Sequence, residues 1–197
     1  ASIYQLPLNF MAQDILEPIA KQLNLGKLNA NMQNWDSLVK RVVAPNNAIT
    51  IAFVGKYTDL KESYKSLTES IIHAGASLDT RVNLKWCDSE RIDENNVGEI
   101  FKDCSGILVA GGFGGRGVEG MICSAKYARE HKIPYLGICL GMQIALIEFA
   151  RNVLGLENAN SMEFDSACKE NVIYLIDNFI DASGTKQIRT HKSPLGG

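Results

Sequence analysis

The chain has 197 residues, and 20 Lys and Arg residues nearly balance 22 Asp and Glu residues, so no global charge would draw it to nucleic acid or to an anionic membrane. Five cysteines without a Cys-x-x-Cys spacing argue against a disulfide framework or a zinc knuckle, which indicates a reducing cytoplasm and no metal site. The length suits one well-buried domain with an appendage, and no segment nears the roughly 18 apolar residues of a membrane span.

The first 47 residues have too few apolar positions to fold alone. We expect a loop through Pro7 and a helix around residues 14–23. A second helix is predicted where Trp35, Leu38, Val39 and Val42 recur at helical spacing, before Pro45 breaks the chain. Residues 1–47 are therefore predicted to form a helical arm or linker that packs on another part of the protein.

From residue 48 onward, strands and helices alternate. The predicted strands are 49–54, 82–86, 107–110 and 134–138, and the predicted helices are 64–76, 97–101, 119–131 and one that begins near Gly141. Such alternation is typical of an α/β fold with a doubly wound, mostly parallel sheet and helices on both faces. Near the end, residues 172–176 and 186–189 flank a turn at 181–184 and predict an antiparallel β-hairpin.

Cys139 stands where an apolar strand meets an amphipathic helix. Gly137 and Gly141 flank it in a Gly-x-Cys-x-Gly pattern that parallels the Gly-x-Ser-x-Gly nucleophile elbow. The positive end of the helix dipole would favour the thiolate there. A free cysteine is more often a small buried hydrophobe, but the two glycines and the strand-to-helix switch favour a nucleophile.

A second glycine-rich segment, residues 111–117, follows the strand 107–110 and contains Gly-x-Gly-x-x-Gly. A dinucleotide site would need an acidic residue about 20 positions further on, and Gly137 stands there, so we disfavour that reading. A plain glycine turn remains open. We favour a loop whose amides at 112–114, with the amide of Leu140, stabilise an oxyanion near the Cys139 sulfur, which is acyl-transfer chemistry.

The segment Gly137-Ile138-Cys139-Leu140-Gly141-Met142-Gln143 resembles the nucleophile segment of class I, triad-type glutamine amidotransferases, whose cysteine attacks the side-chain amide of glutamine and releases ammonia. Within this family, residues 111–120, 55–60, 64–66 and 160–164 are similar to the CTP synthases, and the likeness runs over essentially the whole chain. Residues 1–45 resemble the segment that joins the synthetase domain of those enzymes to the amidotransferase domain.

The resemblance implies a role for each matching residue. Cys139 would form the glutamyl thioester, Gly112 and Leu140 would contact the oxyanion or substrate, and Gln143 and Glu163 would hold the polar end of glutamine, Glu163 by pairing with its ammonium. The implied substrate contacts also include Phe113, Gly141 and Met142. The implied mobile lid, near which the family senses GTP as an activator, is Gly114, Gly115, Arg116 and Gly117. From the residues alone, Glu163 could equally be a solvated surface charge and Gln143 a helix cap.

The chain departs from the family at the triad, which takes its base and carboxylate from a late His-x-Glu unit. None of His73, His131 and His191 is followed by that pattern. The resemblance therefore implies an amidotransferase domain, residues 48–197, that lacks its C-terminal end and follows an absent synthetase domain, which binds UTP and ATP with magnesium in a homotetramer. We expect little or no glutaminase activity from the chain alone, because general acid–base catalysis contributes roughly 10²- to 10⁴-fold.

Two alternatives remain. A DJ-1/PfpI-like enzyme also carries a cysteine elbow on this kind of sheet, but it has no need to hold a glutamine with Gln143 and Glu163. A catalytically dead binding module would explain the missing histidine, although the intact Cys139 and the glycine-rich loop oppose it.

Overall fold

A computed structural model describes residues 2–58, 60–176, 178–180 and 183–188. Backbone contacts divide the chain into two compact units. The first unit consists of Ala1–Ile51 and Asp59–Leu84, and the second consists of Ala52–Thr58 and Lys85–Gly197. Every candidate site residue named from the sequence belongs to the second unit.

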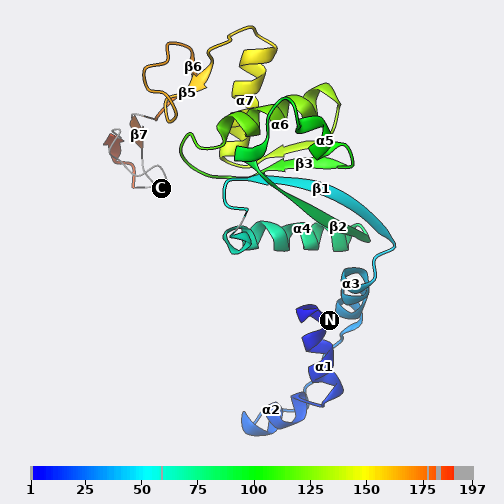
Figure 1. Cartoon of the computed structure of the whole chain (residues 1–197). Coiled ribbons are helices and arrows are strands. Elements are labelled where there is room, and N and C mark those ends of the chain that lie inside the picture. Colours follow the sequence, from blue (N-terminus) through cyan, green and yellow to red (C-terminus); the bar gives the residue numbers. More distant parts are fainter. Residues whose placement is uncertain (1, 59, 177, 181–182, 189–197) are drawn as a thin grey trace. The chain divides into compact units, whose positions relative to one another are not determined.

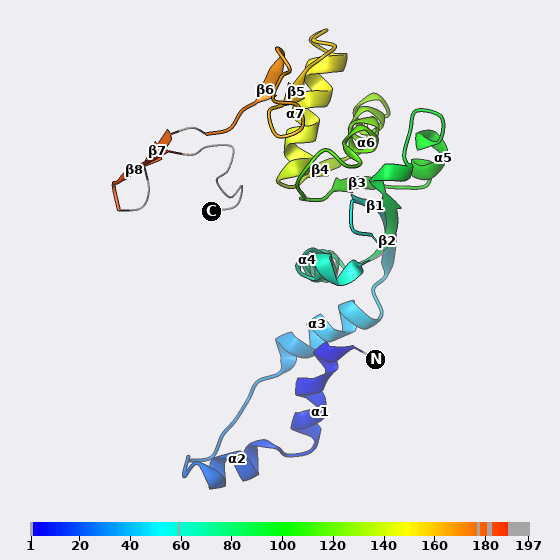
Figure 2. The same ribbon diagram turned by 60° about the vertical axis from the view of Figure 1, so that its left-hand side comes forward.

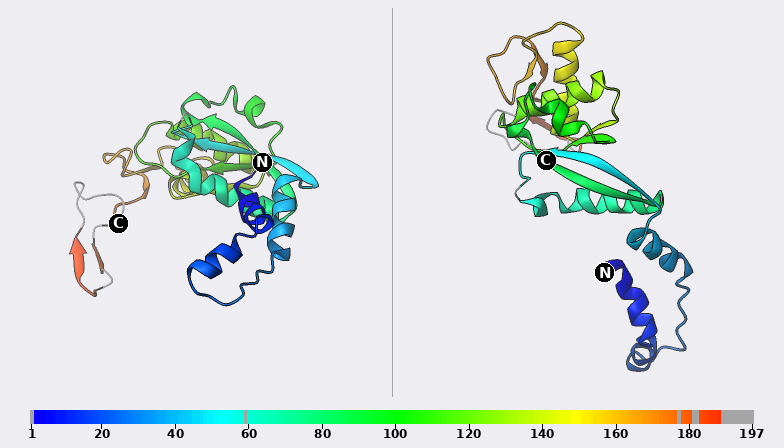
Figure 3. Two further views of the ribbon diagram at one scale, coloured as in Figure 1. Left: turned by 90° about the horizontal axis from the view of Figure 1, so that it is seen from below. Right: turned by 45° about the vertical axis from the view of Figure 1, so that its right-hand side comes forward.

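The first unit is mainly helical. Its helices are η1 (Ile3–Gln5), α1 (Leu6–Ala12), α2 (Leu16–Gln22), α3 (Gln33–Val43), η2 (Lys61–Tyr64) and α4 (Lys65–Ser77). The two expected arm helices are present as α2 and α3, blue to lighter blue in Figure 3. The loop expected through Pro7 is wrong, because Pro7 lies in the first turn of α1, where its missing N–H breaks no helical hydrogen bond.

The arm is tied to α4 by a small polar cluster. The Tyr4 hydroxyl donates to Glu69 Oε2 at 2.7 Å and lies 2.6 Å from His73 Nε2. The indole of Trp35 donates to the carbonyl of Tyr4 at 2.8 Å, so the start of the chain is also joined to α3. These bonds give the short arm helices partners that their own few apolar residues do not provide.

The sheet has the strand order β2-β1-β3-β4. Its strands are β1 (Asn47–Gly55), β2 (Thr80–Asp88), β3 (Gly106–Val109) and β4 (Tyr135–Gly137). β3 and β4 pair in parallel with Val109 opposite Gly137, and the Ala110 amide donates to the Val54 carbonyl at 3.0 Å. The carboxyl ends of β1, β3 and β4 therefore meet at one edge, and the alternation of strands and helices predicted from residue 48 is confirmed.

Two long helices cover β3 and β4 in the second unit. α6 (Val118–Glu130) and α7 (Leu140–Asn152) pack against each other and against both strands, as Figures 1 and 2 show. Their apolar faces meet β3 in a core that includes Met121, Ile144 and Ile147, all fully buried. The buried carboxylate of Glu148 on α7 is paired with Arg129 of α6, whose Nη2 lies 2.8 Å from Glu148 Oε1. Shorter elements, η3 (Ser89–Arg91) and α5 (Val97–Phe101), also contact α6.

The end of the chain differs from the prediction in one strand. β5 (Asn160–Ser161) and β6 (Asn171–Ile173) form a parallel pair, and β7 (Asn178–Ile180) and β8 (Lys186–Ile188) form an antiparallel pair. The predicted hairpin therefore exists, but its first strand is β7 and not residues 172–176. The amide of Met162 donates to the Ile173 carbonyl, so β6 is held next to β5 and is not free to join the hairpin. Residues 181 and 182 of the expected turn lie outside the described residues.

Candidate active site

Cys139 lies at the sharp turn between β4 and α7, with φ 53° and ψ −105°. A residue with a side chain rarely adopts a positive φ, and such strain gathers at functional sites where the surroundings impose it. The side chain of Cys139 is exposed, although Leu140 and Gly141 beside it are buried. The structure thus presents the sulfur at the carboxyl edge of the sheet, as an elbow requires.

The two glycines of the Gly-x-Cys-x-Gly pattern make this turn possible. A Cβ on Gly137 would lie 2.4 Å from both the carbonyl carbon and the oxygen of Gly141. A Cβ on Gly141 would lie 2.1 Å from the carbonyl oxygen of Val109 in β3. Neither contact can be relieved by moving a flexible side chain, so the turn requires glycine at both positions.

The backbone amides of the first turn of α7 follow directly after Cys139. The Gly141 amide donates to the Ile138 carbonyl at 2.9 Å, and the amides of Met142 and Gln143 donate to the Cys139 carbonyl at 3.1 and 3.2 Å. The amide of Leu140 is the first in the helix, and no carbonyl within an α-helix can accept from its first amide. It is therefore suitably placed for the oxyanion role that the sequence predicts for it.

The glycine-rich loop lies beside the nucleophile. A Cβ on Gly111 would lie 3.4 Å from Cys139 Cβ, and one on Gly112 would lie 3.5 Å from Leu140 Cδ2. This closeness follows from the parallel pairing of β3 with β4, because the loop continues from β3 and Cys139 follows β4. The structure therefore brings together Gly112, Cys139 and Leu140, the three residues predicted for the attack and for the oxyanion.

The implied lid, Gly114–Gly117, has two residues with positive φ, Gly114 at 75° and Gly117 at 67°. Phe113 is exposed. Arg116 anchors the far end of the lid: it pairs with Glu90, donates to the Lys56 carbonyl at 2.9 Å and has its guanidinium carbon 5.4 Å from the centre of the Tyr57 ring. The positive φ at these two positions is a backbone conformation that glycine adopts without strain.

Glu163 is directed at this lid. It follows β5, where its amide donates to Ser161 Oγ at 3.2 Å, and its Oε1 accepts a 2.6 Å hydrogen bond from the Gly114 amide. The carboxylate that the family resemblance assigns to the ammonium of glutamine is thus connected to the implied lid through Gly114. Gln143 is half-buried on the first turn of α7, and Met142 is exposed there.

Lys56 also belongs to this site, although the sequence patterns predict no role for it. Lys56 directly follows β1 and is only 4% exposed. Its ammonium donates to the Phe113 carbonyl at 2.9 Å and also to the Gly114 carbonyl. The available signal was a lysine that directly follows a buried strand, at the edge of the sheet where ligands bind.

The histidines do not complete a triad in the described structure. His73 belongs to the first unit and contacts Tyr4. His131 stacks on Tyr127 at the end of α6, which leads into the amino end of β4, whereas Cys139 follows its carboxyl end. His191 lies outside the described residues. Nor do the described residues contain a group of three or more His, Cys, Asp or Glu side chains that could hold a metal ion.

Burial suppresses thiolate formation at three of the other cysteines. Burial raises the pKa of Cys87 to about 11, with a further contribution from Cys104. Burial also raises the pKa of Cys104 and of Cys123. The Cys168 thiol donates to the Asn158 carbonyl at 3.1 Å, whereas Cys139 is exposed at a helix amino end. The site thus provides one cysteine with the setting of a nucleophile.

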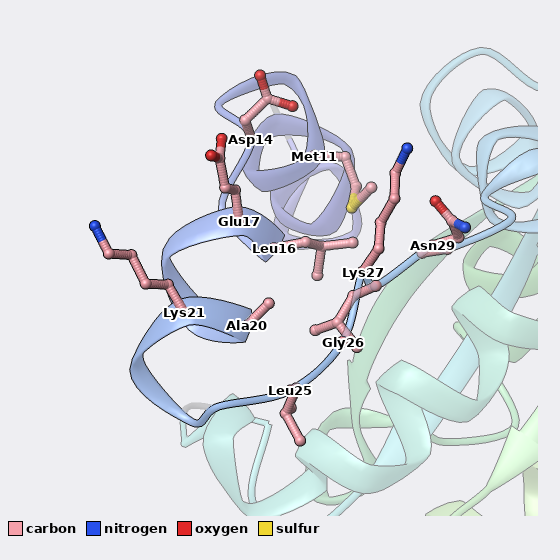
Figure 4. Close-up of a pocket in the computed structure, with 12 residues that line it drawn as sticks. Met11, Asp14, Leu16, Glu17, Ala20, Lys21, Leu25, Gly26, Lys27 and Asn29 are labelled. Atoms are coloured by element: carbon pink, nitrogen blue, oxygen red, sulfur yellow. The ribbon is translucent and has the colours of Figure 1, made fainter.

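The hollow in Figure 4 lies elsewhere, in the arm. It is lined by residues of α2 and of the segment that follows, including Leu16, Glu17 and Lys21, and by none of the candidate site residues.

Across the described ranges, every helix is too short or too polar to span a bilayer.

Comparison with known proteins supports an acyl-transfer site at the carboxyl edge of the sheet. The profile of the family "Glutamine amidotransferase class-I" matches residues 59–192. The CTP synthases of Campylobacter jejuni subsp. doylei and Sulfurimonas denitrificans are 70% and 62% identical over 197 residues, which are 100% of this chain and 36% of each relative. The chain thus spans little more than a third of the length of these curated relatives.

A solved structure, "Trypanosoma brucei CTPS - glutaminase domain with bound acivicin", is 41% identical with a TM-score of 0.61, and the match covers 66% of this chain and 50% of that one. The resemblance to CTP synthases and the expected amidotransferase fold are therefore confirmed. Because the family profile covers more than half of its residues, the chain belongs to the class-I glutamine amidotransferase family.

Proposed function

We propose that this chain is the glutamine amidotransferase part of a CTP synthase, in which ammonia released from glutamine aminates UTP in a synthetase part. The 70% identity to a protein named CTP synthase over the whole chain supports this. The observation that carries the chemistry is the elbow at Cys139, which lies beside Gly111 and Gly112. A nucleophile with amides around it is the machinery of acyl transfer.

In this reaction the Cys139 thiolate attacks the amide carbon of the glutamine side chain, and the carbonyl electrons move to the oxygen. The amides of Leu140 and Gly112 donate to that oxyanion. Collapse re-forms the carbonyl, breaks the carbon–nitrogen bond and releases ammonia once the nitrogen is protonated. Water then attacks the glutamyl thioester and releases glutamate, which returns the thiol.

Recognition of glutamine falls to residues around this centre. Glu163 pairs with the substrate ammonium, as a carboxylate does with a cationic donor. Gln143, on the helix turn that follows the nucleophile, holds the other polar atoms of the amino-acid end. Phe113, Gly141 and Met142 complete the contacts, and the lid closes over the bound glutamine.

Activation of the Cys139 thiol needs a base, and the described histidines do not supply it. His73 and His131 are engaged with Tyr4 and Tyr127, and neither takes the proton of Cys139 in the proposed mechanism. The 197-residue chain alone is therefore expected to have little or no glutaminase activity, at least about 10²- to 10⁴-fold below that of an intact amidotransferase. Turnover near that of an intact enzyme would require a base, and His191→Ala would test the third histidine.

The other substrates, the activator and the oligomeric state are proposed for the whole protein. The synthetase part is proposed to bind UTP and ATP with magnesium, and no group among the described residues fits a magnesium site. GTP is proposed as an activator that acts near the lid, and the whole enzyme is proposed to be a cytoplasmic homotetramer. A DJ-1/PfpI-like enzyme or a dead binding module is not favoured, because the amidotransferase profile matches the chain.

A glutamine analogue that carries an electrophilic diazoketone tests the site without requiring turnover. We expect one adduct per chain, on Cys139, with protection by excess glutamine and no adduct in Cys139→Ser. Cys123 and Cys168 are internal controls, because both are half-buried. Equal labelling of these cysteines, or labelling that glutamine does not slow, would contradict a glutamine pocket.

A further inference from the structure

The peptide unit between Phe113 and Gly114 is held at both of its polar groups. Lys56 Nζ donates to the Phe113 carbonyl at 2.9 Å, and the Gly114 amide donates to Glu163 Oε1 at 2.6 Å. In a trans peptide these two groups point in opposite directions. A buried cation and a carboxylate from different segments therefore fix the orientation of one peptide plane in the lid.

The stem of Lys56 also supports the residue before this peptide. A Cβ on Gly112 would lie 3.5 Å from Lys56 Cδ and 3.7 Å from its Cε, so the aliphatic chain passes directly beside the Gly112 backbone. The guanidinium of Arg116 in turn donates to the Lys56 carbonyl. One lysine thus contacts the loop at 112, 113 and 114, next to Cys139 and Leu140.

From these contacts we propose that Lys56 is the positioning residue of the oxyanion loop, holding the Phe113 and Gly114 carbonyls so that the Gly112 amide faces the oxygen of the amide group attacked by Cys139. The inference rests on the proposed glutaminase function. A reversed Phe113–Gly114 peptide would aim an N–H at the ammonium of Lys56, which accepts no hydrogen bond, so the charge disfavours it.

Lys56 should contribute more to holding the Phe113–Gly114 peptide once glutamine is bound. The substrate ammonium and the Gly114 amide are both donors for the same Glu163 carboxylate. When the ammonium arrives, the Glu163 carboxylate is shared between two donors, so its bond to the Gly114 amide weakens, while the Lys56 contacts remain to keep the peptide in place. Lys56 should therefore affect the rate of thioester formation more than the affinity for glutamine.

The positive charge of Lys56 has an electrostatic cost in the folded state. Burial, assisted by Arg116, lowers the pKa of Lys56 from its ordinary value, against the opposing effects of Glu163 and Glu90. Because the unfolded chain carries the higher pKa, the charged lysine at neutral pH weakens the folded state. A buried charge that opposes folding is expected where function uses it.

The test compares Lys56→Met, which keeps the stem without the charge, with Lys85→Met. Lys85 is a matched control, because its ammonium also donates to a carbonyl, that of Ile100 at 2.6 Å, away from the loop. In the intact enzyme we expect Lys56→Met to lower kcat for glutamine about ten- to a hundredfold. The KM for glutamine should change less than about threefold, and Lys56→Arg should recover part of the rate.

Three readouts separate positioning from general damage. The melting temperature of Lys56→Met should be equal to or above that of the parent protein, and alkylation of Cys139 by iodoacetamide should keep its rate. Labelling by the diazoketone, which needs the oxyanion amides, should slow about tenfold or more. Product formation supported by added ammonia should be unchanged, because it bypasses Cys139.

Unchanged kcat in Lys56→Met would overturn the inference, and so would equal losses in alkylation, melting temperature and kcat. If the unaltered enzyme releases no ammonia from glutamine, the proposed function fails instead. The positioning role of Lys56 can then still be tested by the signal of the Gly114 amide in NMR spectra of ¹⁵N-glycine-labelled protein. One signal in the parent and two in Lys56→Met would support it, and one unshifted signal in both would reject it.

Discussion

The carboxylate of Glu163 accepts a 2.6 Å hydrogen bond from the amide of Gly114, a lid residue 49 positions earlier in the chain. The residue assigned to substrate recognition thus already has a partner before glutamine binds. Its binding energy for glutamine is the difference between two hydrogen-bonded states, which makes Glu163 the natural first target for mutation.

Replacing Glu163 with Gln should weaken glutamine binding much more than it slows chemistry. The amide keeps the shape but loses the charge that pairs with the ammonium, and a hydrogen bond to a charged group contributes about 1.5–3 kcal/mol, which is roughly ten- to a hundredfold in KM. Steady-state glutaminase kinetics measure this. Glu157→Gln, at an exposed position, is the control, and an unchanged KM in Glu163→Gln would contradict the role.

The five cysteines should react in a defined order. With iodoacetamide at pH 8, Cys139 should be modified first, since it alone is exposed. Burial holds the pKa values of Cys87, Cys104 and Cys123 above their ordinary range, so few thiolates form there. Peptide mass spectrometry over time gives the order, and Cys123 modified as fast as Cys139 would refute it.

Alkaline pH should destabilise the fold through Cys87. Its folded pKa is about 11, above the unfolded value near 9.0, so the unfolded state loses its proton first and stability falls as pH rises from about 9 to 11. The loss should reach up to about 2 kcal/mol. Urea unfolding at several pH values measures it. A Cys87→Ala variant is less stable at pH 7 but should show a shallower decline, and parallel declines would contradict this source.

Gly141→Ala should disrupt the elbow. Its new Cβ would lie 2.1 Å from the Val109 carbonyl oxygen, a backbone atom of β3 that cannot move alone. We expect a loss of at least about 3 kcal/mol in the free energy of unfolding, at the upper end for overpacking, with loss of diazoketone labelling. Gly26→Ala is the matched control, because nothing lies within 4 Å of its added Cβ. Equal stability of the two variants would show that the turn tolerates a side chain.

Arg129→Met should be costly because it leaves Glu148 buried without its partner. Glu148 is 3% exposed, and breaking a buried pair from one side costs roughly 3–5 kcal/mol. Chemical denaturation should show that Arg129→Met with Glu148→Leu recovers most of this loss. Lys126→Met removes an exposed pair with Glu94 and should cost less than about 1 kcal/mol. A small effect of Arg129→Met would mean that water reaches the carboxylate.

Much of this fold could be read from local sequence patterns. The apolar run 49–54 gives β1, and the Gly-x-Cys-x-Gly pattern gives an elbow whose glycines have direct steric causes. Pro7 predicts a loop but lies in helix α1, because proline also suits the first helical turn. Residues 172–176 do not supply the first strand of the hairpin, because three-residue strands have too little alternation to fix their partners.

The polar network of the site was less predictable for a different reason. Nothing in the sequence around Lys56 or Glu90 indicates which loop their side chains contact, because those contacts span 57 and 26 positions. They arise only when the sheet places the ends of β1, β2 and β3 near one another. The pairing of Gly114 with Glu163 similarly depends on where the segment after β5 comes to lie.

A single oxygen atom, the carbonyl of Val109, contacts both sides of the nucleophile turn. It accepts a 3.0 Å hydrogen bond from the Ile138 amide, and the Cα of Gly141 packs against it. The position of the sulfur is thus set by the fully buried strand β3 and not by the surface loops around it. Hydrogen–deuterium exchange at the Ile138 amide should accordingly require opening of β3 itself, so that this amide exchanges with the slowest group in the sheet while the lid amides exchange quickly.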